Sequence, residues 1–234
     1  MTDFHTHVLP GMDDGSDSLE QTKRMLQMEY DQGVRKVIAT PHFYAGEDFP
    51  EEFFARRENR LDQVRKMLSE ESWGKEMQVR AGAEVYYFTG MAEAPVLSEF
   101  CVEGTDVLLL EMPFSQWDKE VYREVRSMIE KRKLTVILAH IERYYGFQKS
   151  MEIWDRIFEL PVYAQMNADA FISWKKRRLG MKLLKEGYDV ILGSDCHNTA
   201  KRPPNLAEGR EAIRKKMGEE MLEQIDRTEE RVFD

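Results

Sequence analysis

Short apolar runs alternate along this chain with longer segments in which apolar residues recur every three or four positions. Most of the short runs are rich in Val, Ile and Leu and end at Gly, Pro or a polar residue, which is typical of buried strands. They predict strands over residues 2–7, 35–40, 78–85, 106–112, 134–139, 162–167 and 189–193. The amphipathic segments predict helices over residues 18–32, 50–71, 95–100, 118–131, 151–159, 170–186 and 206–227.

Several residues mark the ends of these elements. Ser18 and Gln21 fit a capping box at the start of the first helix, and Gly33 is placed to end it. Pro41 stops the second strand, and Pro50 can open the next helix. The run 107–110 is apolar without interruption, which predicts a strand that is buried on both faces.

Seven strands that alternate with helices predict an α/β fold with a parallel sheet, in a single domain over residues 1–234. Two architectures fit this order: a parallel (β/α)7 TIM-like barrel and an open doubly wound sheet. We favour the barrel because polar residues follow the ends of six different strands. Barrels collect active-site residues from many strand ends, whereas open sheets concentrate them at one switch point.

Net charge, cysteine content and the length of apolar runs limit the kinds of partner and compartment that we expect for this chain. The formal net charge is -9 with charges spread along the chain, which argues against nucleic acid and anionic membranes as general partners. Two cysteines do not form a disulfide framework. The chain opens on a strand, and no apolar run approaches the ~18 residues of a membrane span. We therefore expect a cytoplasmic protein with no membrane insertion.

The five histidines share one kind of position. His5 and His7 lie two residues apart on the first strand, so their side chains face the same way. His42, His140 and His197 each come just after a strand-like apolar run. One such residue is ordinarily solvated or hydrogen-bonded, but five together predict a metal site.

Carboxylates occupy the same strand ends. Asp13 and Asp14 lie in the turn after the first strand, and Glu84, Glu111 and Asp195 each follow buried residues. A buried carboxylate needs a cation, either a metal ion or a neighbouring Lys or Arg. With the histidines, this set suits two or three ions such as Zn, Mn or Fe.

A cluster of metal ions favours hydrolysis, and phosphoester hydrolysis in particular, because two ions can hold the attacking and leaving oxygens. Arg143 lies three residues after His140, and Arg202 lies five residues after His197. A guanidinium matches phosphate oxygens bidentately, so both arginines are candidate phosphate ligands. Each is also a candidate for an ordinary surface residue.

The ordered motifs resemble a known superfamily. They are Asp-x-His-x-His-x-Leu-Pro-Gly-x-Asp-Asp-Gly, Thr-Pro-His, Gly-Ala-Glu, Ala-His-Ile-Glu-Arg-Tyr and Ser-Asp-x-His-Asn-x-x-x-Arg-Pro-Pro, and they span Asp3 to Pro204. The chain resembles PHP-domain (polymerase and histidinol phosphatase) proteins. Within them it is most similar to the bacterial manganese-dependent protein-tyrosine phosphatases that act on capsule or exopolysaccharide tyrosine kinases.

The resemblance implies a distorted seven-stranded barrel with three divalent ions, Mn first and Fe or Zn as alternatives. It implies one ion held by His5, His7, Glu84 and Asp195, a second held by Glu84, Glu111 and His140, and a third held by Asp14, His42 and His197. Spacing leaves Asp13 open as an alternative to Asp14.

The same resemblance assigns phosphate binding to Arg143 and Arg202. It implies attack on phosphorus by a metal-bound hydroxide, with the tail of a tyrosine autokinase as the phosphotyrosine substrate, and it leaves homo-oligomerisation open. Residues 225–233 depart from the Asn-containing ending that is usual in the family, so the docking of this tail is also open.

Four other functions compete with this reading. Cys196 and Arg202 spell Cys-x5-Arg, the signature of thiol-dependent tyrosine phosphatases, but no glycine lies between them to form a phosphate-binding loop. A histidinol-phosphate type phosphatase uses the same metals. A nuclease is disfavoured by the acidic charge. A metal-binding protein that regulates a kinase by docking, without catalysis, is the non-enzymatic alternative.

Overall fold

The structure is a computed structural model that describes residues 1–232 of the 234-residue chain, so the last two residues of the predicted domain lie outside it. Its strands are β1 Thr2–Thr6, β2 Lys36–Ala39, β3 His42–Phe43, β4 Gln78–Ala81, β5 Glu84–Tyr86, β6 Val107–Glu111, β7 Thr135–Leu138, β8 Tyr163–Asn167 and β9 Val190–Gly193. Over the described range these strands pair in parallel, in one sheet of order β1-β2-β4 and another of order β3-β5-β6-β7-β8-β9. The predicted α/β class with parallel strands is confirmed.

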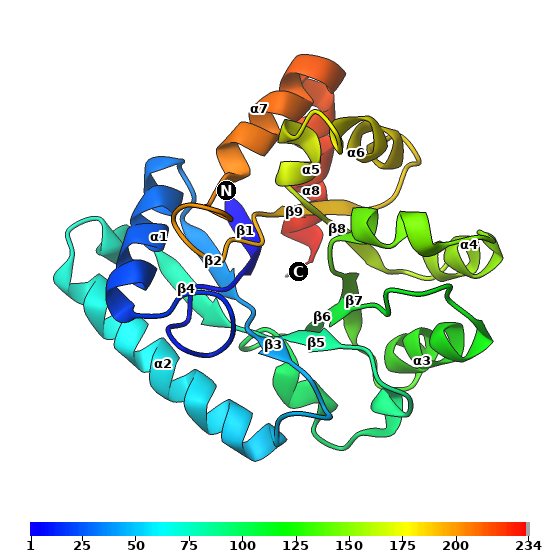
Figure 1. Cartoon of the computed structure of the whole chain (residues 1–234), viewed down its shortest axis with the longest axis horizontal. Coiled ribbons are helices and arrows are strands. Elements are labelled where there is room, and N and C mark those ends of the chain that lie inside the picture. The colour runs from blue at the N-terminus through cyan, green and yellow to red at the C-terminus, as the bar shows by residue number, and fades with distance from the viewer. Residues whose placement is uncertain (233–234) are drawn as a thin grey trace.

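Six helices of the described chain lie between strands in the sequence, as the alternating pattern predicted, and two follow β9. They are α1 Leu19–Asp31, α2 Pro50–Glu70, α3 Lys119–Glu130, α4 Glu152–Phe158, α5 Asp169–Ile172, α6 Arg177–Leu184, α7 Leu206–Met217 and α8 Glu219–Arg231. Short 3-10 turns are η1 Gly74–Glu76, η2 Met91–Glu93, η3 Leu97–Phe100, η4 Ile141–Arg143 and η5 Tyr145–Phe147. Figure 1 shows these helices around the outside of the strands. None of the helices in residues 1–232 has the length and apolar character that a membrane crossing requires.

Backbone hydrogen bonds connect the two sheets. The amide of Asp195 donates to the carbonyl of His5 over 2.8 Å, and the amide of His7 donates to the carbonyl of Cys196 over 2.9 Å, so the end of β9 lies against β1. At the other junction, the amide of Glu84 donates to the carbonyl of Pro41 over 3.0 Å. The chain therefore passes from one sheet to the other at the level where the candidate ligands lie.

Two predicted strands needed correction. The strand predicted over 78–85 is two strands, β4 and β5, separated by Gly82 and Ala83. No strand was predicted for residues 42–43, just after the strand predicted over 35–40, but they form the separate strand β3. Pro41 has no amide hydrogen, so the ladder that joins β2 to β4 ends there and a second ladder begins with His42 opposite Glu84.

One predicted helix was also divided, and the helices predicted for the tail are two in number. The helix expected over 170–186 is α5 and α6, joined by residues 173–176. The turn lets α6 fold back closely over α5, where a Cβ added to Gly180 would lie 2.7 Å from the carbonyl oxygen of Ala170. The segment 206–227 is α7 and α8, which meet at Gly218, a residue with φ of 90°.

The alternation of side chains along the strands divides the core in two. On β6, Leu108 and Leu110 pack in the large cluster between strands and helices. The other face of the strands forms a smaller cluster made of Phe4, Ile38, Val102, Val107, Leu109, Ile137, Ala139, Ile191 and Val232. Glu111 lies on the same face of β6 as Val107 and Leu109. A buried carboxylate therefore lies at the end of the smaller apolar cluster.

Candidate metal centre

The structure brings the side chains of all nine predicted ligands together. His5 lies in β1, His42 in β3, Glu84 in β5 and Glu111 in β6, and the others lie in the segments that follow a strand. Their imidazole nitrogens and carboxylate oxygens form one continuous cluster rather than separate sites. Seven of the nine residues are buried: His5, His7, Glu84, Glu111, His140, Asp195 and His197.

The first group consists of His5, His7, Glu84 and Asp195. Nε2 of His5 lies 3.1 Å from Nε2 of His7 and 3.0 Å from Oε2 of Glu84. Oδ1 of Asp195 lies 3.4 Å from Nε2 of His7 and 3.7 Å from Nε2 of His5. Four donor atoms therefore converge on one point, as a tetrahedral metal site requires.

The second group extends from the other oxygen of Glu84. Oε1 of Glu84 lies 2.7 Å from Nε2 of His140, which in turn lies 3.4 Å from Oε1 of Glu111. The two oxygens of Glu84 thus face different groups of ligands. This arrangement suits a carboxylate that bridges two cations.

The third group lies at the edge of the cluster and is more exposed. Oδ1 of Asp14 lies 3.2 Å from Nε2 of His197 and 3.6 Å from Nε2 of His42. The side chain of Asp14 is 69% exposed, so this group faces solvent. His42 also directs Nδ1 to within 2.9 Å of Oε2 of Glu84, so the three groups are continuous.

Several atoms of the cluster lie close to other polar atoms but make no hydrogen bond of acceptable geometry among the described residues. They are Oε2 of Glu84, Oε2 of Glu111, Nδ1 of His42, Nδ1 of His140 and Nε2 of His197. Buried polar atoms without partners are costly, and closely spaced imidazole nitrogens and carboxylate oxygens lower that cost when they bind a cation. The donor set therefore fits divalent metal ions.

The electrostatics of the cluster favour ionised carboxylates. Burial opposes ionisation of Glu84, but His5, His140 and His42 outweigh it and hold the pKa of Glu84 well below its usual range. Burial likewise opposes ionisation of Asp195, and its pKa is nevertheless well below normal beside the imidazoles and Arg143. Both side chains are therefore ready to bind cations at neutral pH.

Both predicted arginines reach the cluster through Asp195. Nη2 of Arg143, from η4, contacts Oδ2 of this carboxylate, and Nη2 of Arg202 lies 2.6 Å from its Oδ1. Each guanidinium remains about one-third exposed at the mouth of the cluster. Two partly exposed guanidinium groups beside a donor set that fits metal ions form a site that suits a phosphate group.

Residues 1–232 match the family model described as "Capsular polysaccharide synthesis, CpsB/CapC". The chain belongs to the CpsB/CapC family. It is similar to the tyrosine-protein phosphatase CpsB of Streptococcus agalactiae serotype V, with 26% identity over 235 residues that cover 96% of this chain and 94% of that protein. It is also similar to the tyrosine-protein phosphatase YwqE of Bacillus subtilis, with 26% identity over 228 residues that cover 94% and 87%.

Solved structures share the fold of this CpsB/CapC protein. One belongs to a study of YwqE from Bacillus subtilis and CpsB from Streptococcus pneumoniae, described there as unique metal-dependent tyrosine phosphatases. It has a TM-score of 0.85 and 23% identity, and covers 99% of this chain and 94% of that one. A phosphotriesterase homology protein from Escherichia coli has a TM-score of 0.61 at 14% identity, and covers 100% and 98%.

In this CpsB/CapC protein, Asp13 and Asp14 lie in different environments. Oδ2 of Asp13 accepts a hydrogen bond from Nδ1 of His7 over 2.7 Å and one from the amide of His42 over 2.9 Å. Asp13 therefore lies behind His7 and orients it, whereas Asp14 faces the cluster. Burial opposes the ionisation of Asp13, yet its contact with His7 holds its pKa well below normal.

Sequence analysis missed a polar pair on β8. Gln165 accepts hydrogen bonds at Oε1 from Nδ1 of His5 over 2.9 Å and from the amide of His140 over 2.7 Å. Its Nε2 donates to Asn167, whose Nδ2 donates to Asp195 over 2.7 Å. Gln165 and Asn167 have the same i, i+2 spacing as His5 and His7, and that spacing at a strand end was the available signal.

Two candidate ligands have unusual backbone conformations. His140 has φ of 29° and Asp195 has φ of 54°, values that residues other than glycine rarely adopt. The amide of His140 is held by Gln165, and that of Asp195 by the carbonyl of His5. Neighbouring strands therefore maintain a local strain that turns both side chains into the cluster.

The thiol of Cys196 does not face the mouth. The residue is fully buried, and its Sγ lies 3.9 Å from Oε1 of Glu29. Burial, Glu29 and Asp3 raise the pKa of the Cys196 thiol well above its usual value, so it is not a thiolate at neutral pH. The structure therefore argues against the thiol-dependent alternative.

Aromatic residues lie near the mouth of the cluster, beside His140 and His42. Tyr144 is buried and its hydroxyl accepts a hydrogen bond from the amide of Met112. Phe114 remains 39% exposed, with its ring 6.1 Å from that of His140. Tyr44, which sequence analysis did not select, lies with its ring 5.4 Å from His42 beside a cavity of about 360 Å3.

Proposed function

We propose that this chain is a metal-dependent protein-tyrosine phosphatase that hydrolyses phosphotyrosine on a protein substrate. The observation that carries the proposal is the convergence of nine buried or mouth-facing ligands beside Arg143 and Arg202. The names of the relatives support the reaction class, and the description of the family as one of capsular polysaccharide synthesis supports a substrate in that process. The tail of a tyrosine autokinase is the substrate that we propose.

We propose three divalent ions, with Mn as the native metal. His5, His7, Glu84 and Asp195 would hold one ion, Glu84, Glu111 and His140 a second, and Asp14, His42 and His197 a third. The short distances within each group and the unpartnered donor atoms support this division. We also propose that the two sheets form one distorted seven-stranded barrel in a single domain, which the hydrogen bonds between β9 and β1 support.

Divalent ions bound in this cluster supply Lewis acidity and an activated water. The protein's own residues position the phosphate and the donors. Arg143 and Arg202 offer planar N–H donors to the phosphate oxygens. Both can replace their contact with the carboxylate of Asp195 by hydrogen bonds to the more highly charged phosphate ester. Gln165 and Asp13 fix the orientation of His5 and His7. Phe114 and Tyr44 lie where they would contact the tyrosine ring of the substrate.

The test is hydrolysis of a phosphotyrosine peptide by the purified protein in three states: as isolated, after chelation, and after addition of Mn. Loss of activity on chelation and recovery with Mn is the expected result. Activity that persists in protein shown by metal analysis to be empty would contradict the proposal. If phosphotyrosine is not cleaved in any state but histidinol phosphate is, the substrate class is wrong while the metal chemistry stands.

A further inference from the structure

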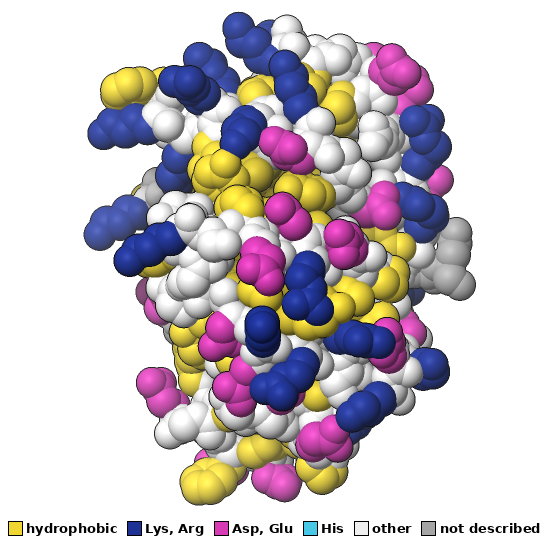
Figure 2. Space-filling model, turned by 90° about the vertical axis from the view of Figure 1, so that its right-hand side faces the viewer, with side chains coloured by type: hydrophobic (Ala, Val, Ile, Leu, Met, Phe, Trp, Pro, Cys, Tyr) yellow, Lys and Arg dark blue, Asp and Glu magenta, His cyan; other side chains and the backbone are white. Residues whose placement is uncertain are grey.

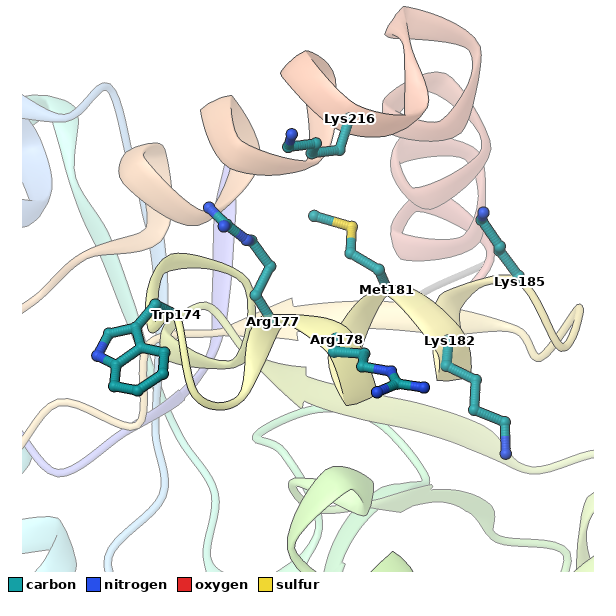
Figure 3. Close-up of a pocket in the computed structure, with 7 residues that line it drawn as sticks. All are labelled: Trp174, Arg177, Arg178, Met181, Lys182, Lys185 and Lys216. Atoms are coloured by element: carbon teal, nitrogen blue, oxygen red, sulfur yellow. The ribbon is translucent and has the colours of Figure 1, made fainter.

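A basic groove lies between α6 and α7, on the outside of the strands. Figure 3 shows the residues that line it, namely Trp174, Arg177, Arg178, Met181, Lys182, Lys185 and Lys216. The groove has a volume of about 460 Å3. Five of its lining side chains are cationic and none is acidic, in a protein whose formal net charge is -9.

Most of these cations have no carboxylate partner. Within residues 1–232, no ion pair involves Arg177, Arg178, Lys185 or Lys216, and Lys182 contacts only the hydroxyl and ring of Tyr145. The acidic residues nearby are engaged elsewhere or lie beside the groove. Asp169 pairs with Lys176, Glu211 pairs with Arg214 and Lys215, and Glu208 lines an adjacent cavity. Glu186 follows Lys185 in the chain and acts electrostatically on Lys182, so most but not all of the positive charge of the groove is left for an external anion.

An exposed aromatic residue stands at one end of the groove. Trp174 is 77% exposed and precedes the sequence Lys-Lys-Arg-Arg at residues 175–178. Figure 2 shows Lys and Arg side chains gathered around a protruding hydrophobic side chain at the upper left of that face. An indole beside several cations is the combination that binds at the interface of an anionic bilayer, because the ring enters the headgroup region while the cations meet the lipid charges.

We propose that this groove and Trp174 form a docking surface for an anionic lipid bilayer. The cations come from both sides of the groove and from two helices, so they cover an area, as a charged membrane does. Nucleic acid is less suitable because Trp174 is the one tryptophan with a highly exposed ring, and single strands are bound by a series of stacking aromatics. Net charge alone disfavours anionic membranes as general partners, whereas this proposal rests on a local concentration of basic residues.

The first experiment is sedimentation of the full chain with vesicles of phosphatidylglycerol and phosphatidylcholine, beside vesicles of phosphatidylcholine alone. Binding is expected only to the anionic vesicles and is expected to weaken as NaCl is raised, since salt screens exposed charges. The double variant Arg177→Glu/Arg178→Glu is expected to reduce the partition coefficient at least about tenfold. The matched control is Lys119→Glu/Arg123→Glu on α3, which makes the same charge change and is expected to retain most of the binding.

Tryptophan fluorescence gives a second, independent readout. Trp117 and Trp154 are buried and Trp73 is partly buried, so Trp174 is the tryptophan that would move from water into the interface. A blue shift of the emission on addition of anionic vesicles is expected, and Trp174→Phe is expected to abolish that shift while retaining substantial binding. Both groove variants are expected to keep the hydrolytic activity on a soluble phosphopeptide, which confirms that they are folded.

Three results would overturn the inference: no binding to anionic vesicles at low salt, equal loss of binding in the α3 control, or a blue shift that persists in Trp174→Phe. Absence of vesicle binding together with binding of a fluorescent poly-glutamate peptide, lost in Arg177→Glu/Arg178→Glu, would reject the bilayer and assign the surface to an acidic protein segment. The inference is independent of the proposed phosphatase activity, so either can fail alone.

Discussion

Oε1 of Gln165 lies 2.9 Å from Nδ1 of His5 and so fixes the tautomer in which Nε2 of His5 presents a lone pair to the cluster. The same oxygen accepts a hydrogen bond from the amide of His140. One side chain on β8 therefore holds the ring of His5 and the backbone of His140 in place. Ligand orientation in metal sites depends on such partners, whose removal typically lowers metal affinity 10–100-fold. Gln165 therefore has a testable role although it lies outside the predicted ligand set.

We expect Gln165→Leu to reduce the affinity for Mn about 10–100-fold, because Nδ1 of His5 and the amide of His140 lose their acceptor. Calorimetric titration of the metal-free protein with Mn measures this directly. Gln224→Leu, at an exposed position on α8, is the control and is expected to bind Mn as the unmodified protein does. Unchanged affinity in Gln165→Leu would assign Gln165 a packing role only.

The two neighbouring aspartates are expected to respond differently to the same substitution. Asp14→Asn is expected to lose one of the three proposed ions, because Asp14 faces His42 and His197. Asp13→Asn is expected to keep the metal stoichiometry and to weaken the ion at His7, because Asp13 contacts Nδ1 of that residue. Elemental analysis after dialysis distinguishes them, and the reverse pattern would make Asp13 the ligand.

Arg143→Ala and Arg202→Ala are each expected to lower kcat/KM for a phosphotyrosine peptide about 10²–10³-fold, because each removes charged donors from the developing phosphate charge. Lysine at either position is expected to restore only part of the activity, since it lacks the planar fork. Both arginines also contact Asp195, so the metal content of each variant is measured as well. A loss of activity that is fully explained by loss of metal would contradict direct phosphate binding.

Cys196→Ser is expected to retain metal-dependent activity. The sulfur is buried beside Glu29, and the serine hydroxyl can occupy the same space and hydrogen-bond to that carboxyl group. A thiol reagent is likewise expected to leave the folded enzyme active. Complete loss of activity in a variant whose metal content is unchanged would restore the thiol mechanism.

Glu229 provides a prediction for pH-dependent stability. Burial on α8 raises its pKa to about 8 from the ordinary 4.5. Below pH 4.5 the side chain is protonated in both the folded and the unfolded protein, and the folded state has its full stability. As the pH rises from 4.5 through 8 the unfolded chain ionises first, so the free energy of unfolding falls. The shift corresponds to at most about 5 kcal/mol.

Glu229→Gln keeps the shape of the side chain, and its oxygen can still accept the amide hydrogen of Leu192. We expect this variant to have a higher Tm than the unmodified protein at pH 8 and a similar Tm at pH 5. Glu230→Gln, at an exposed position next to it, is expected to change neither value appreciably. An equal effect of Glu229→Gln at both pH values would show that Glu229 is not buried as an acid.

The alternation of strands and helices and the residues of the polar cluster were predictable from the sequence. Apolar runs are local signals, so the parallel α/β class and the strand ends that carry His5, Glu84 and His140 could be predicted from them. A histidine or carboxylate that follows a buried strand is also a local observation. For that reason the polar cluster and both arginines were predictable before the strands were assembled.

The neighbour that each of these side chains contacts follows from the folded structure and not from the sequence pattern. Asp13 and Asp14 cannot be distinguished by their spacing in the sequence. Their roles differ because the loop places Asp13 against Nδ1 of His7 and Asp14 against His197. Gln165 contacts His5, which is 160 residues away in the chain. Such contacts depend on the register of neighbouring strands, which the pattern of one strand does not specify.

The positions at which predicted strands and helices are interrupted, and the local concentration of basic residues, also depend on tertiary contacts. The interruption at Gly82 depends on a ladder that ends at Pro41, and the division of α5 from α6 depends on close packing at Gly180. The basic groove gathers residues from α6 and α7 that are up to 39 positions apart (Arg177 to Lys216), so a net charge of -9 gave no sign of it. Composition sums the charges along a chain, whereas folding determines where they lie on its surface.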